Sequence, residues 1–433
     1  MEYQSPEFDQ TGLQHALKNS YVGKTIEDVK TPAFVIDRSI FESNCAGMIK
    51  KAKEWGADFR AHLKTHKSTE GTKLQLATSE GKTGAVVVST VKEAWEVWNS
   101  ELVKDGYVND ILYGLPIGLN KISDLSALWD QMELYGGVVR LLVDHPEQIK
   151  LLEAFGREEG KSRPWSVFVK INGGQNRAGV ATSSEALKSL VSAILGSSVV
   201  RLYGFYAHAG NAYASKSQSE ATKYLSSEVQ TVNDAAQYTL THFKEQLASI
   251  QHTEPFVLSV GSTPTAHVSG LEAREILKQT LHGKLELHAG NYPLLDLQQQ
   301  HTSLIDYPRI AQHVRALVVS YYPARGNNGE DEALIDAGAI AFSKDTGPSG
   351  SFGEVIGKPW TLARISQEHG ILRCTNMDSP DAKLEVGTIV EIVGQHACLI
   401  AARSQAYPWY YVVDSRVGGG KEIVDVWVAW KGW

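Results

Sequence analysis

Residues 58–90, DFRAHLKTHKSTEGTKLQLATSEGKTGAVVVST, contain the pattern from which the fold can be read. Two short apolar runs, 58–64 and 84–90, flank a longer stretch of helical pattern. The apolar residues of each run are nearly continuous instead of alternating, which is typical of parallel strands covered by helices on both faces. Six further runs of this kind follow, at 110–116, 139–144, 165–172, 200–210, 255–262 and 285–291.

Helical patterns separate these runs. Residues 91–103 and 184–195 place apolar side chains at helical spacing. Thr182 and Ser183 are candidate caps of the second helix, and residues 217–249 are consistent with one long helix. Eight strand–helix units over about 240 residues predict an N-terminal (β/α)8 TIM barrel. A doubly wound open sheet is the alternative, but eight successive units favour closure.

The texture changes after about residue 305, where helical periodicity nearly disappears. Strand-like runs at 314–322, 332–342, 388–393, 397–402 and 410–414 are separated by Gly, Pro and Asp turns. They predict a second, mainly β domain. We therefore expect a barrel domain over 30–304 and a β domain over 305–433, with residues 1–29 packed against the latter. The segment TPAFVID, 31–37, either starts the barrel or joins the β domain.

Composition narrows the class of protein. The 433 residues are 42% hydrophobic and carry a net charge of -7, which argues against disorder and against a nucleic-acid partner held by a basic face. Three cysteines, Cys45, Cys374 and Cys398, are too few for a disulfide framework and fit a reducing compartment. The N-terminus has no signal-peptide pattern, and no apolar stretch approaches a membrane span. We expect a cytoplasmic protein with no membrane partner.

A cationic cluster ends the first strand of the expected barrel. Arg60, His62, Lys64, His66 and Lys67 lie within eight residues, so they need an anion or a solvated setting. Lys64 falls at the C-terminal end of the strand, which is the catalytic face of a TIM barrel. A lysine close to other cations has a lowered pKa and forms Schiff bases more readily. A solvated basic loop explains the cluster equally well.

Two glycine-containing loops follow the seventh and eighth strands. The first reads SVGSTPT, 259–265, and the second reads HAGNY, 288–292. Many TIM barrels bind a phosphate with the loops after these two strands. Together the loops favour a phosphate site over ordinary turns.

Two further constellations are weaker by themselves. His396 and Cys398 would point to the same side of a strand and could both reach one metal, with positions left for water or substrate. Spacing alone favours a buried cysteine beside a hydrogen-bonded histidine. Arg177, Tyr206 and Tyr213 are expected around the barrel mouth, where they contact either a cofactor ring or one another.

Taken together, these residues resemble a known family. The motifs that carry the resemblance are TPAFVID, RAHLKTHK, NRAGV, GFYAHAGNAY, SVGSTPT, HAGNY, DAGAIAFSKD and GQHACLI. They are similar to those of the fold-type III pyridoxal 5'-phosphate (PLP) enzymes, whose founding member is alanine racemase. The resemblance is strongest to the zinc-dependent, eukaryotic-type D-serine dehydratases and the D-threonine aldolases. The HxC pair in place of HxD discriminates between these two groups.

The resemblance implies roles for individual residues. Lys64 would be the Schiff-base lysine and the base at the substrate Cα. Tyr206 would meet the pyridine nitrogen, with Arg177 as its competitor or neighbour and Tyr213 as a further cofactor-side candidate. The zinc ligands would be His396 and Cys398. The residues that would hold the phosphate are Gly261, Ser262, Thr263, Gly290 and Asn291. Two subunits would form a homodimer in which each β domain closes the barrel mouth of the other.

The implied activity is that of a lyase. Zinc on the β-hydroxyl would assist elimination from a D-3-hydroxy amino acid, with D-serine giving pyruvate and ammonia. D-Threonine and D-threo-3-hydroxyaspartate are alternative substrates, and a D-threonine aldolase is an alternative enzyme. A racemase would need a second base, for which Tyr321 and Tyr322 are candidates. A PLP-carrier protein is the non-enzyme alternative. The roles of His66, His208 and His369 stay open.

Overall fold

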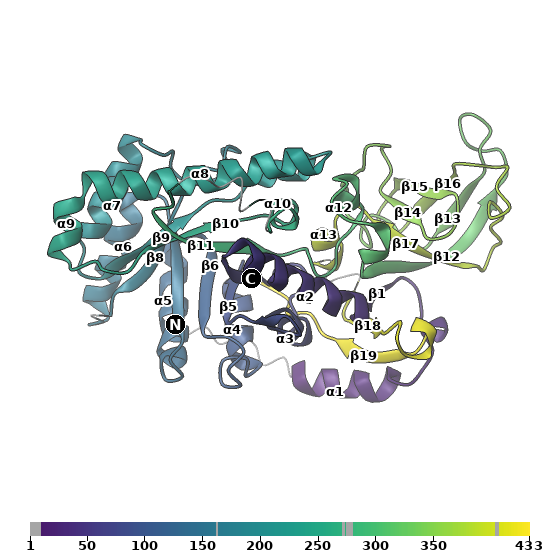
Figure 1. Ribbon diagram of the computed structural model, residues 1–433. Coiled ribbons are helices and arrows are strands. Elements are labelled where there is room, and N and C mark those ends of the chain that lie inside the picture. Colours follow the sequence, from purple (N-terminus) through teal and green to yellow (C-terminus); the bar gives the residue numbers. More distant parts are fainter. Residues whose placement is uncertain (1–9, 162, 271–272, 274–279, 403–406) are drawn as a thin grey trace.

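A closed barrel of eight parallel strands forms the N-terminal part of the computed structural model, which describes residues 10–161, 163–270, 273, 280–402 and 407–433. The strands follow one another around the barrel in the order β2-β5-β6-β7-β8-β9-β10-β11, and β11 pairs with β2 (Figure 1). The predicted TIM barrel is confirmed, and the open sheet is wrong. The barrel strands are β2 Asp58–His62, β5 Ala85–Val88, β6 Asp110–Pro116, β7 Val138–Val143, β8 Trp165–Lys170, β9 Val200–Tyr206, β10 Phe256–Val260 and β11 Gly283–Ala289.

Helices surround these strands. They are α2 Arg38–Trp55, α3 Thr69–Leu76, α4 Val91–Asn99, α5 Leu119–Glu133, α6 Pro146–Glu158, α7 Glu185–Gly196, α8 Gln218–His242, α9 Lys244–Ser249 and α10 Thr263–His267. The short helix α12 Leu297–His301 lies beside the second part of the molecule, where the amide of Gln298 donates to the carbonyl oxygen of Gln395 (Figure 1). The predicted helix 91–103 ends early, at Asn99, and 217–249 is two helices instead of one. The side chain of Ser184 caps α7, so Thr182 and Ser183 were the wrong candidates.

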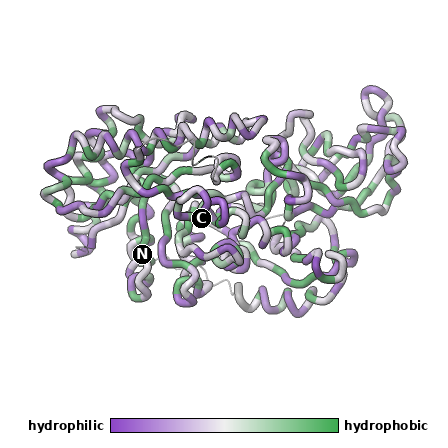
Figure 2. Tube along the Cα trace, in the orientation of Figure 1, coloured by the Kyte–Doolittle hydropathy of each residue, from purple (hydrophilic) through white to green (hydrophobic). Residues whose placement is uncertain are grey.

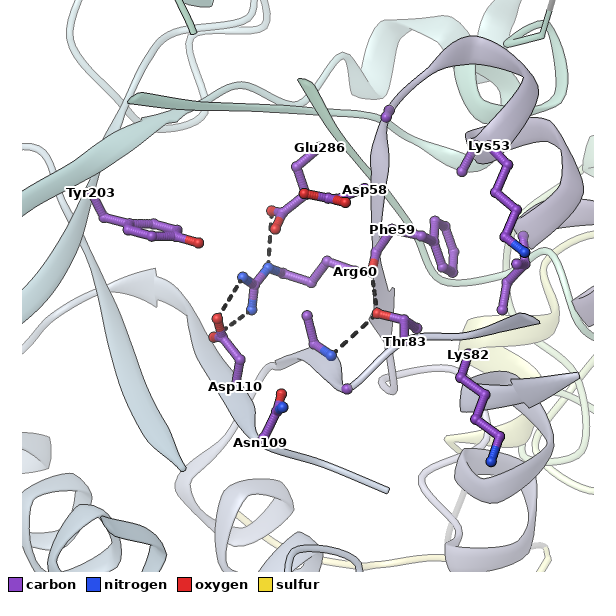
Figure 3. Close-up of a pocket in the computed structure, with 15 residues that line it drawn as sticks. Lys53, Asp58, Phe59, Arg60, Lys82, Thr83, Asn109, Asp110, Tyr203 and Glu286 are labelled. Atoms are coloured by element: carbon purple, nitrogen blue, oxygen red, sulfur yellow. Dashed lines mark hydrogen bonds and ion pairs between the residues drawn. The ribbon is translucent and has the colours of Figure 1, made fainter. Parts of the chain in front are cut away.

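The floor of the barrel, where the strands begin, holds a buried cluster of ion pairs (Figure 3). Arg60 donates to Asp110 at 2.8 Å and to Glu286 at 2.9 Å, and Arg140 donates to Asp110 at 2.7 Å. This cluster lines part of a cavity of about 280 Å³. Arg60 therefore finds its counter-charges inside the barrel, away from the rest of the cationic cluster predicted around Lys64.

A nine-stranded sheet forms the second part of the molecule, in the order β13-β16-β15-β14-β17-β12-β1-β18-β19. Because β13 also pairs with β12, six of its strands close into a circuit. All its pairings are antiparallel except that of β1 with β18. Its strands are β1 Ala33–Asp37, β12 Gln312–Tyr322, β13 Glu332–Ile335, β14 Gly353–Val355, β15 Trp360–Ile365, β16 Gly370–Cys374, β17 Ile389–Gly394, β18 Tyr410–Val413 and β19 Ile423–Trp427.

The structure decides one open question about this part and corrects one prediction. The segment 31–37 supplies β1, which lies between β12 and β18 and so joins the second sheet instead of starting the barrel. The apolar run 397–402, predicted as a strand, forms the short helix α13 Ala397–Ala401. A short apolar run fits a buried strand and a buried helix equally well, so periodicity could not decide between them.

The N-terminal segment packs on the second sheet. Helix α1, Gln10–Tyr21, lies along β19 (Figure 1). Leu17, Ile26 and Val29 join a hydrophobic cluster with β1, β18 and β19. Residues 1–9 of the predicted segment 1–29 lie outside the described residues, and the boundary between 304 and 305 stays a prediction. The remaining elements are β3 Ala77–Thr78, β4 Gly81–Lys82, η1 Ile26–Asp28, η2 Gly210–Ala214, η3 Tyr307–Arg309 and η4 Gly418–Gly420.

Along the helices that surround the barrel, hydrophobic and hydrophilic residues alternate (Figure 2). This alternation is expected when one face of a helix is buried against the strands. The predicted inward face of α4 is an example, since Val91, Ala94 and Val97 are all buried. Among the described residues, no helix combines the length and the apolar character that crossing a membrane requires.

Candidate active site at the barrel mouth

Lys64 lies two residues beyond the end of β2, at the C-terminal face of the barrel. Burial lowers the pKa of His62, and the charge of Lys64 lowers it further. Burial and the charges of Arg177 and Lys64 do the same to the pKa of His208. Both pKa values lie well below 6.5, so the lysine faces two imidazoles that are neutral near pH 7.

The other members of the cationic cluster have local partners. Lys67 pairs with Glu93 at 2.9 Å. His66 is fully buried, and its ring nitrogens lie 3.0 Å from Ser68 Oγ and 2.7 Å from Gln75 Oε1. Burial lowers the pKa of His66 to about 4. His66 and Lys67 therefore support the loop, and Lys64 is the lysine of the cluster that is left available at the barrel mouth.

The structure also shows where His208 and His369 lie, whose roles the sequence left open. The Nδ1 of His208 lies 2.8 Å from the carbonyl oxygen of Gly261, so Nδ1 carries the hydrogen and donates it. This contact ties the loop after β9 to the loop after β10. His369 is exposed in the turn between β15 and β16, where its carbonyl accepts from the amide of Ser366. His208 thus belongs to the mouth, and His369 belongs to a surface turn.

The loops after β10 and β11 meet as predicted, because their strands are neighbours. Gly261 has a φ of +144°, and a Cβ added there would lie 2.1 Å from the carbonyl oxygen of His288, so only glycine fits. The amide of Asn291 donates to Thr263 Oγ1 at 3.1 Å. The Ser262 hydroxyl caps α10 and is buried. We call the loop residues Gly261, Ser262, Thr263, Gly290 and Asn291 the cradle.

An aromatic pair forms the base of the mouth. The rings of Tyr206 and His288 stack with centroids 4.1 Å apart and planes 11° from parallel. The Nε2 of His288 is buried with no hydrogen-bond partner among the described residues. Tyr206 is buried, whereas Arg177 is exposed. The two side chains nevertheless interact: burial raises the pKa of Tyr206, and the charge of Arg177 opposes this rise.

Two buried titratable groups at the mouth were missed from the sequence. Lys170, at the end of β8, places its Nζ 4.7 Å from the centroid of the Tyr206 ring. Burial, reinforced by the charge of Arg177, lowers the pKa of Lys170 to about 7. Burial raises the pKa of Glu228, on α8, to about 7. A lysine ending an apolar strand could have been noticed in the sequence, whereas Glu228 has no comparable local signal.

His396 and Cys398 meet at the start of α13, although by a different route from the predicted strand. His396 occupies the N-cap position, where its side chain does not cap the helix, and Cys398 lies in the first turn. Burial lowers the pKa of His396, but hydrogen bonds with Cys398 and Asp345 and the nearby charges raise it overall, to about 9. The Nδ1 of His396 lies 2.7 Å from Asp345 Oδ2. With Nδ1 bound by Asp345, Nε2 is the ring nitrogen that remains for Cys398 or for a metal held together with it.

The pair lies against the barrel. The Sγ of Cys398 is 3.1 Å from the hydroxyl of Thr65, the residue after Lys64. That hydroxyl also lies 3.1 Å from the carbonyl oxygen of Gly290 in the cradle. Tyr213 is drawn in as well: burial raises its pKa, Cys398 adds to the rise, and Thr263 is its hydrogen-bond partner. The predicted site residues thus come together from both parts of the chain.

Asp296 joins the cradle to the histidine–cysteine pair and was also missed. Its Oδ2 accepts from Asn291 Nδ2 at 2.6 Å and from the amide of Ala397 at 2.7 Å. Asp296 is fully buried. In the described part of the chain, no group of three or more His, Cys, Asp or Glu side chains is arranged to hold a metal. A metal on this pair would therefore keep open positions for water or substrate.

Comparison with known proteins agrees with this architecture. Residues 36–274 match the family described as "Alanine racemase, N-terminal domain", and residues 311–413 match the "Putative serine dehydratase domain". The chain belongs to the alanine racemase-like family, in its D-serine dehydratase branch. This fold-type III family uses PLP, so the barrel mouth is the expected place for that cofactor.

Individual members of the family extend over nearly the whole chain. A D-serine dehydratase of Schizosaccharomyces pombe is 43% identical over 96% of this chain and 95% of its own length. A D-serine dehydratase of Saccharomyces cerevisiae is 33% identical over 96% of this chain and 99% of its own. The solved D-threo-3-hydroxyaspartate dehydratase of Delftia sp. HT23 is 27% identical, with a TM-score of 0.76 over 95% of this chain and all of the other.

Proposed function

We propose that this protein is a PLP- and zinc-dependent lyase that converts D-serine to pyruvate and ammonia. One observation carries the proposal: Cys398 of the histidine–cysteine pair lies 3.1 Å from Thr65, the residue next to Lys64. A metal on this pair would stand beside the amine that serves the substrate Cα. The relatives named D-serine dehydratase support the choice of substrate.

The residues at the mouth fit PLP. Gly261 has no side chain, and a Cβ at this position would collide with the backbone of His288. Ser262 and Thr263 add buried hydroxyls to the cradle. Lys64 would be the covalent anchor, the cradle would hold the phosphate, and the ring would lie near Tyr206 with Arg177 and Tyr213 as further contacts. When bound, the cofactor supplies an electron sink for charge that develops at the substrate Cα.

The residues of the chain supply the proton chemistry. Lys64 is placed to take the Cα proton, and its imidazole neighbours His62 and His208 stay neutral near pH 7. Neither imidazole therefore adds a positive charge beside the amine. Tyr206 and His288 close the mouth from below as a stacked pair.

The histidine–cysteine pair fits zinc. Asp345 fixes Nδ1 of His396 in the arrangement common for metal-binding histidines, and Cys398 supplies a soft thiolate. A zinc ion here would act as a Lewis acid on the β-hydroxyl, which is otherwise a poor leaving group. Loss of that hydroxyl is elimination, so the pair favours a dehydratase over an aldolase, which needs a base on the hydroxyl instead.

A second candidate substrate is D-threo-3-hydroxyaspartate, because the relative from Delftia sp. is named for its dehydration. The racemase alternative gains no support in this chain. The hydroxyl of Tyr321 is hydrogen-bonded to Asp331, and the ring of Tyr322 carries the guanidinium of Arg325 at 3.4 Å from its centroid. A homodimer and a cytoplasmic location remain predictions from the resemblance and the composition.

A coupled assay for 2-oxo acid formation tests the proposal. Zinc-sensitive pyruvate formation from D-serine is the expected result, with D-threo-3-hydroxyaspartate measured beside it to rank the two substrates. Glycine and an aldehyde from D-threonine, without pyruvate from D-serine, would show an aldolase. Cofactor binding without turnover of any of these substrates would favour the carrier alternative.

A further inference from the structure

Glu228 lies behind the cradle and has no part in the chemistry proposed above. It projects from α8 and is 1% exposed. One carboxylate oxygen, Oε1, accepts from the amide of Ala209, in the loop after β9. The amide of Gly261 and the hydroxyl of Thr265, in the loop after β10, approach the same carboxyl group. Since Gly261 follows β10 and Thr265 belongs to α10, a single side chain thus touches the loop after β9 and the segment after β10 that frame one side of the cradle.

The carboxyl group is incompletely satisfied. Its second oxygen, Oε2, is buried and makes no hydrogen bond of ordinary geometry among the described residues. A buried carboxylate with unmet hydrogen-bonding capacity is costly unless it is protonated or paired. Its donors are neutral, and Glu228 forms no ion pair with any of the described residues. The group therefore behaves as an acid that gives up its proton reluctantly.

The charged and titratable groups that face Glu228 come from neighbouring strands. Lys170, at the end of β8, lowers the pKa of Glu228, and the carboxylate in turn raises the pKa of Lys170. Tyr206, at the end of β9, also senses the carboxylate. His267, the titratable residue of α10, responds to Arg309 and Lys51 instead. Burial outweighs the help from Lys170, because the pKa of Glu228 still rises to about 7.

We propose that Glu228 is the positioning residue of the cradle, holding the loops after β9 and β10 together from behind and favouring cofactor phosphate when the carboxyl is protonated. This inference rests on the proposed function, because it takes the cradle to be the phosphate site. A phosphate on the mouth side of Gly261 and an ionised carboxylate on the other side repel across a few buried residues. Protonation of Glu228 removes that repulsion while its contact with Ala209 persists.

The test compares Glu228→Gln and Glu228→Ala with the wild-type chain, all stripped of cofactor. The dissociation constant of PLP is measured by quenching of tryptophan fluorescence at about pH 6 and about pH 8.5. Glutamine is neutral at both pH values and keeps the shape of the protonated acid. The loss of PLP affinity from about pH 6 to about pH 8.5 should therefore be about five- to tenfold smaller in Glu228→Gln than in the wild type. Glu228→Ala should bind PLP about tenfold or more weakly at both.

Two controls make the result specific. Pyridoxal without its phosphate should be bound equally by all three proteins, because the cradle no longer contributes. Glu332→Gln changes another buried carboxyl, in the second sheet, and should bind PLP as the wild type does. Circular dichroism confirms that each variant is folded.

The possible outcomes separate cleanly. If Glu228→Gln follows the pH dependence of the wild type, the proton-linked part of the inference is overturned. If both Glu228 variants bind PLP as the wild type does, or lose pyridoxal as strongly as PLP, the positioning role is overturned. If the wild type itself does not bind PLP, the proposed function fails, and the inference that rests on it fails too.

Discussion

The two ends of one barrel handle buried charge in opposite ways. At the floor, Arg60 is shared between Asp110 and Glu286 (Figure 3). Arg140 adds a second donor to Asp110. Although burial alone would raise the pKa of Asp110, the two arginines lower it below its ordinary value. Each charge of this cluster is matched by a partner in direct contact.

At the mouth, buried titratable groups lie near one another, but the described residues give them no ion-pair partner in direct contact. Burial shifts the pKa values of Lys170 and Glu228 to about 7 from opposite directions. The Nε2 of His288 has no partner among the described residues. The difference teaches how to tell structural charge from functional charge: a paired cluster stabilises the fold, whereas unmatched groups at the C-terminal ends of parallel strands await a ligand.

Replacing the mouth lysine should have the largest effect. Lys64→Ala should lower D-serine turnover by about 10⁴-fold and abolish the visible absorbance of the cofactor-bound protein, because it removes the anchor and the base together. Lys67→Ala is the matched control from the same loop, since the Lys67 ammonium is paired with Glu93. It should change turnover by less than about threefold. A visible band that survives in Lys64→Ala would show that another amine holds the cofactor.

The histidine–cysteine pair should come next. Cys398→Ala should lower turnover by about 10³-fold while leaving the visible absorbance intact, because the metal acts on the leaving group and not on cofactor binding. Chelation of the wild type should reproduce this result. Cys374→Ala, a buried cysteine on β16 of the same sheet, should keep turnover near wild type. Full activity of Cys398→Ala would remove the metal role from this pair.

The floor should respond in stability and not in catalysis. Arg60→Met leaves Glu286 and part of Asp110 without their counter-charge, so the free energy of unfolding in urea should fall by about 3–5 kcal/mol. Turnover per folded molecule should change by less than about threefold, because the floor is at the opposite end from Lys64. A large loss of turnover with unchanged stability would break the distinction between the two ends.

The sequence could predict most of the barrel because each strand is a nearly continuous apolar run, which tertiary contacts reinforce instead of overriding. The family resemblance, and not the spacing of any one motif, also predicted that Lys64, the cradle and His396 with Cys398 belong to one site. The partner of β1 could not be read, because strand pairing across almost 300 residues leaves no local mark. Asp296 and Glu228 were missed for a related reason, since each acts by joining segments that are distant in sequence.

The smallest expected effect comes from Lys170, whose lowered pKa can be tested directly through the pH dependence of the free energy of unfolding. Its pKa is about 7 in the folded chain and has an ordinary value of 10.5 when unfolded. Below about pH 7 both states hold the proton, so the native protein carries the full cost of a buried ammonium. Between these two values the unfolded state binds more protons, and the free energy of unfolding therefore rises with pH.

Lys170→Met should be more stable than the wild type at neutral pH, and the gap should close by about 1–2 kcal/mol between about pH 7 and about pH 9. Urea unfolding of the cofactor-free proteins at several pH values measures this gap. Lys188→Met, which replaces an exposed lysine on α7, should keep the pH slope of the wild type. A constant gap between Lys170→Met and the wild type would mean that Lys170 keeps its charge in the folded chain. The amine would then be matched like the charges of the floor, and the contrast between the two ends of the barrel would rest on Glu228 and His288 alone.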